Sequence, residues 1–132
     1  VLPATVNAWR NTLSRSFMHR RLWPNDPDCL MLRTDHTDLT AEQGRARALG
    51  VAASGGMALV SDDLSLLDDD ARSLLDEVLT VGRAVDTEAM VDGPPRCEDL
   101  LEAGPPTRLL TAPHELVGVP DTGTAHLQGR LT

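Results

Sequence analysis

The chain has 132 residues, of which 12 are basic and 20 are acidic, so its formal net charge at pH 7 is −8. This length is typical of a single domain. The negative charge argues against nucleic-acid and anionic-membrane partners, because such surfaces gather Arg and Lys on one face. The longest apolar stretch, Leu49–Val60, is much shorter than the ~20 residues that a membrane-spanning helix needs.

The first predicted element is a helix from Thr5 to Arg21. Its apolar residues recur at three- and four-residue steps, as expected for one buried helix face: Val6, Trp9, Leu13 and Phe17. Pro24 stops the helix, and Leu22–Asn25 is predicted as a short strand that leads into a loop. The more apolar run Cys29–Leu32 is the alternative position for this strand.

A second helix is predicted from Ala41 to about Ala53. Thr40 and Gln43 have the spacing of a capping box at its start, and Ser54–Gly56 supplies the glycines that commonly end a helix. Met57–Val60 follows as four apolar residues without polar alternation, which favours a parallel strand covered on both faces.

A third helix is predicted after the acidic start Asp68–Asp70. Its apolar stripe has helical spacing: Ala71, Leu74, Leu75, Val78 and Leu79. From Asp86 the chain becomes rich in Gly and Pro, and Thr107–Val119 is predicted to form short strands around Pro113. We therefore expect parallel βα units in residues 1–85 and a separate region over residues 86–132.

The run from Trp23 to Cys29 carries most of the chemical information. Pro24 and Pro27 restrict its backbone, so Asp26 and Asp28 are presented on a stiff turn. Carboxylates accept hydrogen bonds from sugar hydroxyls, and the ring of Trp23 offers an apolar face for a pyranose. An Asp beside Pro also commonly caps local backbone amides, and this structural role stays open.

Two motifs in this order resemble the closing part of the catalytic barrel of family 36 glycoside hydrolases, the microbial α-galactosidases. The motifs are LWPNDPDCLMLR, preceded by RNTLSRSFMHR, and ASGGMALVSDDLSLL. Related family 27 enzymes have a similar W-N-D-P-D turn. The resemblance spans roughly Asn7 to Asp86. It implies an α/β fold in which residues 1–85 are the last βα units of a partial (β/α)8 barrel, and residues 86–132 are the linker and first strands of a β-rich domain.

The resemblance implies a retaining α-galactosidase that hydrolyses terminal α-linked galactose from oligosaccharides without a cofactor. The family places its two reacting aspartates in a Lys-x-Asp strand motif and an Arg-x-x-x-Asp loop, and neither motif occurs before Trp23. No catalytic residue is therefore assigned, and this chain alone is expected to be inactive. Asp28 is implied to contact a sugar hydroxyl and Cys29 to line the same pocket, with Trp23 and Asp26 as further substrate-binding candidates.

Two other functions stay open. A galactosyl-transferring relative of the raffinose-synthase type would carry the same motifs. A free-standing acidic module that binds sugar or calcium is the second, although the alternating Asp, Asn and Gly loop of a calcium site is absent from the sequence. A homo-oligomeric state of the full-length protein is also left open.

The remaining polar residues predict structural roles. Asp62 and Asp63 follow an apolar run, and we expect them to cap the next helix. Cys29 and Cys97 form no CxxC pair, so no zinc site or disulfide is indicated. We expect no metal site at the histidines, which lack partners at ligand spacing: His19, His36, His114 and His126. The chain opens at Val1 without a signal segment, which indicates a fragment and leaves the compartment open, with the cytoplasm favoured.

Overall fold

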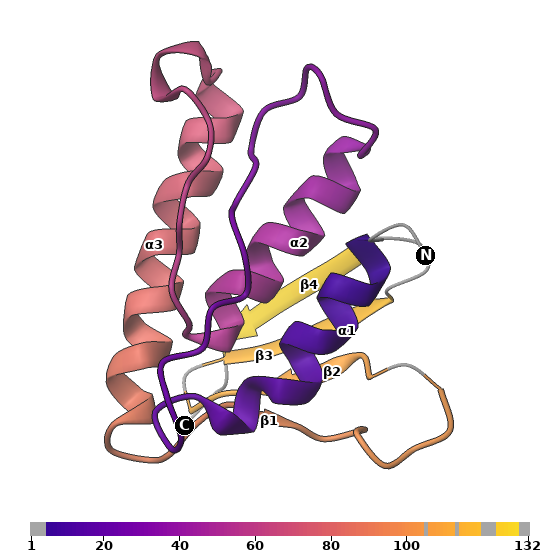
Figure 1. The fold of residues 1–132 in the computed structure, drawn as a ribbon, viewed down its shortest axis with the longest axis vertical. Coiled ribbons are helices and arrows are strands. Elements are labelled where there is room, and N and C mark those ends of the chain that lie inside the picture. Colours follow the sequence, from indigo (N-terminus) through magenta and orange to yellow (C-terminus); the bar gives the residue numbers. More distant parts are fainter. Residues whose placement is uncertain (1–4, 105, 113, 120–123, 130–132) are drawn as a thin grey trace.

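The computed structural model describes residues 5–104, 106–112, 114–119 and 124–129. In this part of the chain three α-helices lie beside one four-stranded sheet (Figure 1). The helices are α1 (Thr5–Arg15), α2 (Ala41–Ser54) and α3 (Asp69–Ala89), with 3-10 turns η1 (Ser16–Met18) and η2 (Leu64–Leu66). The strands are β1 (Arg96–Cys97), β2 (Arg108–Leu110), β3 (His114–Val119) and β4 (Thr124–Gly129).

Local side-chain chemistry sets the ends of α2 and the start of α3. The Gln43 amide donates to the Thr40 hydroxyl at 3.2 Å, and the Gln43 side chain accepts from the Thr40 amide at 3.0 Å, so the predicted capping box is confirmed. Gly55, with φ of 68°, ends α2 in the left-handed conformation that glycine adopts without strain. The Asp68 carboxylate accepts from the Ala71 amide at 2.8 Å and caps α3.

Helix α2 is the centre of the fold because both of its sides are buried. One side packs with α3 and the extended segments that flank α2, in a cluster of buried apolar residues: Leu30, Leu32, Ala48, Val51, Ala52, Leu67, Ala71, Val78, Val81 and Val85. The other side packs with α1 and the sheet, in a second cluster: Trp9, Leu13, Ala46, Leu49, Ala53, Leu109 and Leu116. The many alanines of α2 allow neighbouring elements to approach it from both sides.

The sheet is an antiparallel meander in the order β1-β2-β3-β4. Leu109 of β2 pairs with Leu116 of β3, and Leu116 pairs with Leu127 of β4, so leucines from three strands lie side by side toward the helices. Strands β2 and β3 confirm the prediction of short strands within Thr107–Val119. Pro113, around which they were predicted, lies outside the described residues.

The predicted fold class, a partial (β/α)8 barrel, is wrong. The named strands pair only in antiparallel fashion, and within the described residues the parallel contacts are isolated bridges at His19–Trp23 and Leu30–Val60. Parallel strands need partners far away in the sequence, whereas the antiparallel hairpins of residues 96–129 close over short connections. The structure is a small mixed α/β fold with three helices and an antiparallel sheet in its described part.

The two short strands predicted before the sheet are also corrected. Leu22–Asn25 is not one of the strands β1 to β4. The extended backbone at Leu30 forms a single parallel bridge with Val60 instead. The apolar run Met57–Val60 is covered on one face only, since Met57 is 43% and Leu59 is 49% exposed while its other residues pack against the first cluster. Apolar character alone did not distinguish a strand buried on both faces from an extended segment buried on one.

The helix predictions hold with changed ends. The first helix stops at Arg15 and continues as η1, so Phe17 at the end of the predicted stripe is 46% exposed. The third helix runs to Ala89. The division of the chain into residues 1–85 and 86–132 stays a prediction. No helix in the described ranges is long and apolar enough to cross a membrane.

Candidate functional site

The turn from Asn25 to Cys29 is held by its own carboxylates. The Asp28 amide donates to Asp26 Oδ1 at 2.9 Å, and the Cys29 amide donates to Asp28 Oδ1 at 2.7 Å. Asp28 has φ of 78°, a left-handed conformation that Asp tolerates better than most residues. Pro27 between them is buried. Each carboxylate therefore uses one oxygen to hold the backbone of the turn.

Asn25 fastens this turn to three other parts of the chain. Its amide donates to Nδ1 of His19 at 3.1 Å, its side-chain Nδ2 donates to the Arg15 carbonyl at 2.9 Å, and its carbonyl accepts from the Met57 amide at 2.9 Å. These contacts reach the end of α1, the residue that follows η1 and the segment after α2. The start of the turn is consequently fixed to the helical layer.

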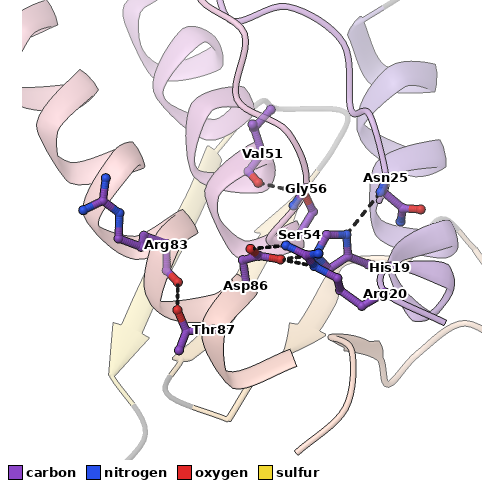
Figure 2. Close-up of polar contacts among 9 residues, drawn as sticks. All are labelled: His19, Arg20, Asn25, Val51, Ser54, Gly56, Arg83, Asp86 and Thr87. Carbon is purple, nitrogen blue, oxygen red and sulfur yellow. Dashed lines mark hydrogen bonds and ion pairs between the residues drawn. The ribbon is translucent and has the colours of Figure 1, made fainter. Parts of the chain in front are cut away.

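A polar cluster built on the buried His19 joins Asn25 to α3, and its other two members, Arg20 and Asp86, are partly exposed (Figure 2). His19 is 1% exposed, and its Nε2 lies 2.7 Å from Asp86 Oδ1. Arg20 donates from Nε at 2.8 Å and from Nη2 at 2.7 Å to the two oxygens of the same carboxylate. Chiefly because of the hydrogen bond from Arg20, the pKa of Asp86 falls to about 2. Asp86 is therefore an ionised acceptor at neutral pH.

A pocket of about 350 Å³ opens beside the turn, between it and α1. Its lining residues include one Trp, one Arg, two Asp, two Asn, one Thr and one Ser among these: Ala8, Asn11, Thr12, Arg15, Met18, Trp23, Asn25, Asp26, Pro27, Asp28 and Ser54. Trp23 is 54% exposed, so a ligand can reach it from solvent. The pocket has the volume of a small-molecule site.

Three of the four substrate-binding candidates come together in this pocket: Trp23, Asp26 and Asp28. The Asp28 side chain is 78% exposed, with Oδ2 3.9 Å from Nη2 of Arg47. Cys29 does not line this pocket, and its carbonyl accepts from Arg47 Nη2 at 3.4 Å. The assignment of these four residues to substrate binding stays a prediction.

The acidic residues after Val60 brace the backbone. Asp63 accepts from the Ser65 amide at 2.9 Å and caps η2, and the Ser65 hydroxyl lowers its pKa. Asp62 reaches in the other direction, since its carboxylate accepts from the Leu32 amide and lies 3.6 Å from Arg33 Nη1. Asp63 thus caps the 3-10 turn η2, whereas α3, the next predicted helix, is capped by Asp68, and Asp62 joins the two extended segments.

Metal binding finds no support in the described ranges. No three side chains among His, Cys, Asp and Glu lie together there in a way that would hold an ion. The His36 side chain is 91% exposed, and its Nε2 lies 3.9 Å from Asp35 Oδ2. The sequence-based expectation of no metal and no cofactor remains a prediction.

Sequence reasoning missed the residues behind the pocket. His19 and Asp86 are 67 positions apart, and no motif links them. Arg15, which lines the pocket, is predicted from the sequence only as part of a helix. The one sequence signal for this cluster is that His19, Arg20 and Arg21 lie a few positions before the Asn25–Cys29 turn.

No model of a known protein family matches this chain.

Proposed function

We propose that the pocket beside the Asn25–Cys29 turn binds a terminal galactose unit, and that this chain supplies the sugar-binding wall of a retaining α-galactosidase. The observation that carries the proposal is that the pocket gathers Trp23, Asp26 and Asp28, residues of the motif that resembles those enzymes. The proposal assigns binding, and not bond cleavage, to these residues.

The chemistry of the pocket suits a monosaccharide. Galactose has an apolar patch on one face of its ring, which can stack on an exposed indole such as that of Trp23. Its hydroxyls donate to carboxylates and accept from guanidinium groups, and Asp26, Asp28 and Arg15 offer both kinds of partner. A volume of about 350 Å³ lies at the small end of ligand pockets, which favours one sugar unit over a long oligosaccharide.

The binding test is a titration of the chain with galactose, followed by tryptophan fluorescence. Trp9 is 6% exposed and Trp23 is 54% exposed, so a ligand on the pocket changes mainly the Trp23 signal. We expect saturation with a Kd of about 1 mM, typical of a monosaccharide held by few contacts, and weaker binding of glucose. No saturable response to galactose would overturn the proposal.

Two variants, followed by calorimetry or ligand NMR, separate the ring from the charge. Trp23→Ala removes the stacking surface, and Asp28→Asn keeps a side chain that tolerates left-handed φ and bonds to the Cys29 amide while removing the carboxylate. Each should weaken galactose binding by about 5-fold or more, from the usual value of such contacts. The matched controls, Leu66→Ala and Asp38→Asn, change exposed residues that do not line the pocket and should bind as the wild type does.

A hydrolysis assay completes the test. Because no reacting aspartate is assigned to this sequence, the purified chain should not cleave a chromogenic α-galactoside. Specific turnover that is lost in Asp26→Asn or Asp28→Asn would instead make these carboxylates the reacting groups and would contradict the binding-only role.

A further inference from the structure

The hydrogen bonds of His19 define one tautomer of its ring. Nδ1 accepts the Asn25 amide hydrogen at 3.1 Å, so this nitrogen carries no proton. Nε2 lies 2.7 Å from Asp86 Oδ1, so it carries the ring hydrogen and donates it to the carboxylate. Addition of a second proton would set an N–H group at Nδ1 against the N–H group of Asn25.

The surroundings of His19 hold this arrangement. His19 is 1% exposed. Arg20 donates hydrogen bonds to both oxygens of Asp86, and this keeps Asp86 Oδ1 oriented toward Nε2 of His19. The backbone next to the ring forms a hydrogen-bonded turn, in which the Arg20 amide donates to the Trp23 carbonyl at 3.0 Å. The chain from His19 to Asn25 is thus tied at both ends, with Trp23 inside the tied segment.

We propose that His19, held in the Nε2–H tautomer by Asp86, is the positioning residue of the pocket: it fixes the Asn25 amide and thereby the placement of Trp23 and Asp26. The role in ligand binding rests on the proposed galactose site, while the effect on the turn does not. His19 touches no ligand, because it is buried and does not line the pocket.

Two substitutions of His19 separate its two nitrogens. In His19→Asn the side-chain oxygen stands near the place of Nδ1 and continues to accept from Asn25. In His19→Gln the side-chain amide stands near the place of Nε2 and continues to donate to Asp86, but the acceptor for Asn25 is lost. Both variants lose the ring packing and one of the two ring hydrogen bonds, so a purely structural cost would be similar in the two.

The expected results differ for a positioning and for a structural role. His19→Gln should weaken galactose binding by about 3- to 10-fold, the usual consequence of one lost hydrogen bond, while His19→Asn stays within about 2-fold of the wild type. The NMR resonances of the Asn25 amide and the Trp23 indole should shift in His19→Gln and return toward their wild-type positions in His19→Asn. Equal affinities and equal shifts in the two variants would overturn the proposal.

The tautomer of His19 can also be tested on the wild-type protein, so this test does not depend on the folding of a variant. Two-bond proton–nitrogen NMR correlations distinguish the ring tautomers, and we expect His19 to show Nε2–H at neutral pH. An Nδ1–H ring, or a doubly protonated ring, would overturn the proposal. If the wild type binds no galactose, the proposed function fails, and the tautomer and the two resonance shifts still decide whether His19 positions the turn.

Discussion

Gly56 lies against the carbonyl oxygen of Asn25 so closely that a Cβ on Gly56 would stand 2.7 Å from that oxygen. The same Cβ would lie 3.1 Å from Cδ of Pro27. Asn25 is held by hydrogen bonds at its amide and its carbonyl, and Pro27 is buried, so neither neighbour can move aside freely. The contact brings the segment after α2 against the candidate pocket and requires glycine at this position.

Gly56→Ala should destabilise the protein by about 1 to 3 kcal/mol, the usual cost of an overpacked contact with backbone. The free energy of unfolding in urea measures this cost. Gly44→Ala is the matched control, because a Cβ at Gly44 would meet nothing within 4 Å and the residue lies in α2. There the better helix propensity of Ala should stabilise the protein by about 0.5 to 1 kcal/mol. An unchanged free energy of unfolding in Gly56→Ala would show that the Asn25–Cys29 turn can move to make room for the Cβ.

The Asp86 cluster predicts acid sensitivity. The pKa of Asp86 is lowered from its ordinary value of 3.8 to about 2 in the folded protein. The hydrogen bond from Arg20 is the main cause, and His19 lowers the pKa further, whereas burial raises it. A lowered pKa means that the stabilisation is complete above about pH 4 and is lost as the pH falls toward 2. With screening at a partly exposed pair, it amounts to about 1 to 2 kcal/mol.

Asp86→Asn tests this expectation. At pH 6 the variant should be less stable than the wild type by the stated amount in urea unfolding, and the difference should shrink between pH 4 and pH 2, where the wild-type carboxylate takes up its proton. Asp38→Asn, at an exposed position in the loop before α2, serves as the control for the loss of one negative charge. A difference that stays constant with pH would rule out the carboxylate charge as its cause.

Asp99 is the main polar anchor at the start of β2. It is 8% exposed and accepts from the Thr107 amide and hydroxyl, both at 2.7 Å, and from the Arg108 amide at 3.0 Å. Asp99→Ala leaves these donors unpaired and should cost about 2 to 4 kcal/mol in urea unfolding. Its neighbour Glu98, whose side chain is 40% exposed in an ion pair with Arg108, is the control. Glu98→Ala should change stability by less than about 1 kcal/mol; equal costs at both positions would contradict the anchor role.

The features that the sequence predicts well are those that depend on residues close together along the chain. The Thr40–Gln43 capping box, the Asp68 cap and the glycine end of α2 each involve groups a few positions apart, and all three are found. The turn carboxylates belong to the same class, since Asp26 and Asp28 bond to amides one or two residues away. Their local chemistry is readable without knowledge of the fold.

Pairings between distant segments were predicted poorly. The run Met57–Val60 has the composition of a covered parallel strand, but its pairing partner and the cover on its second face are properties of the whole fold. The contact between His19 and Asp86 spans 67 positions and has no periodic signal. The sequence therefore predicted the turn beside the pocket, through Trp23 and the two aspartates, and did not predict the cluster of His19, Arg20 and Asp86.

Cys97 should be an unreactive thiol. Burial raises its pKa to about 12, aided by the hydrogen bond and negative charge of Asp99, whose Oδ1 lies 3.3 Å from the Cys97 Sγ. The thiolate is the form that attacks an alkylating reagent, so at pH 8 Cys97 should react with iodoacetamide about 100-fold or more slowly than free cysteine. A Cys29→Ser background removes the other thiol, and mass spectrometry follows the reaction.

The same reaction tests the role of Asp99. Asp99→Asn removes the charge that opposes thiolate formation, so the Cys97 rate should rise by about 10-fold in the folded protein. Glu98→Gln, which removes a neighbouring exposed charge, should leave the rate nearly unchanged. Unfolding in urea should bring Cys97 close to the rate of free cysteine in every variant, because burial and the Asp99 contact are then both lost. A fast reaction of Cys97 in the folded wild type would show that solvent reaches the thiol and that the carboxylate does not suppress its ionisation.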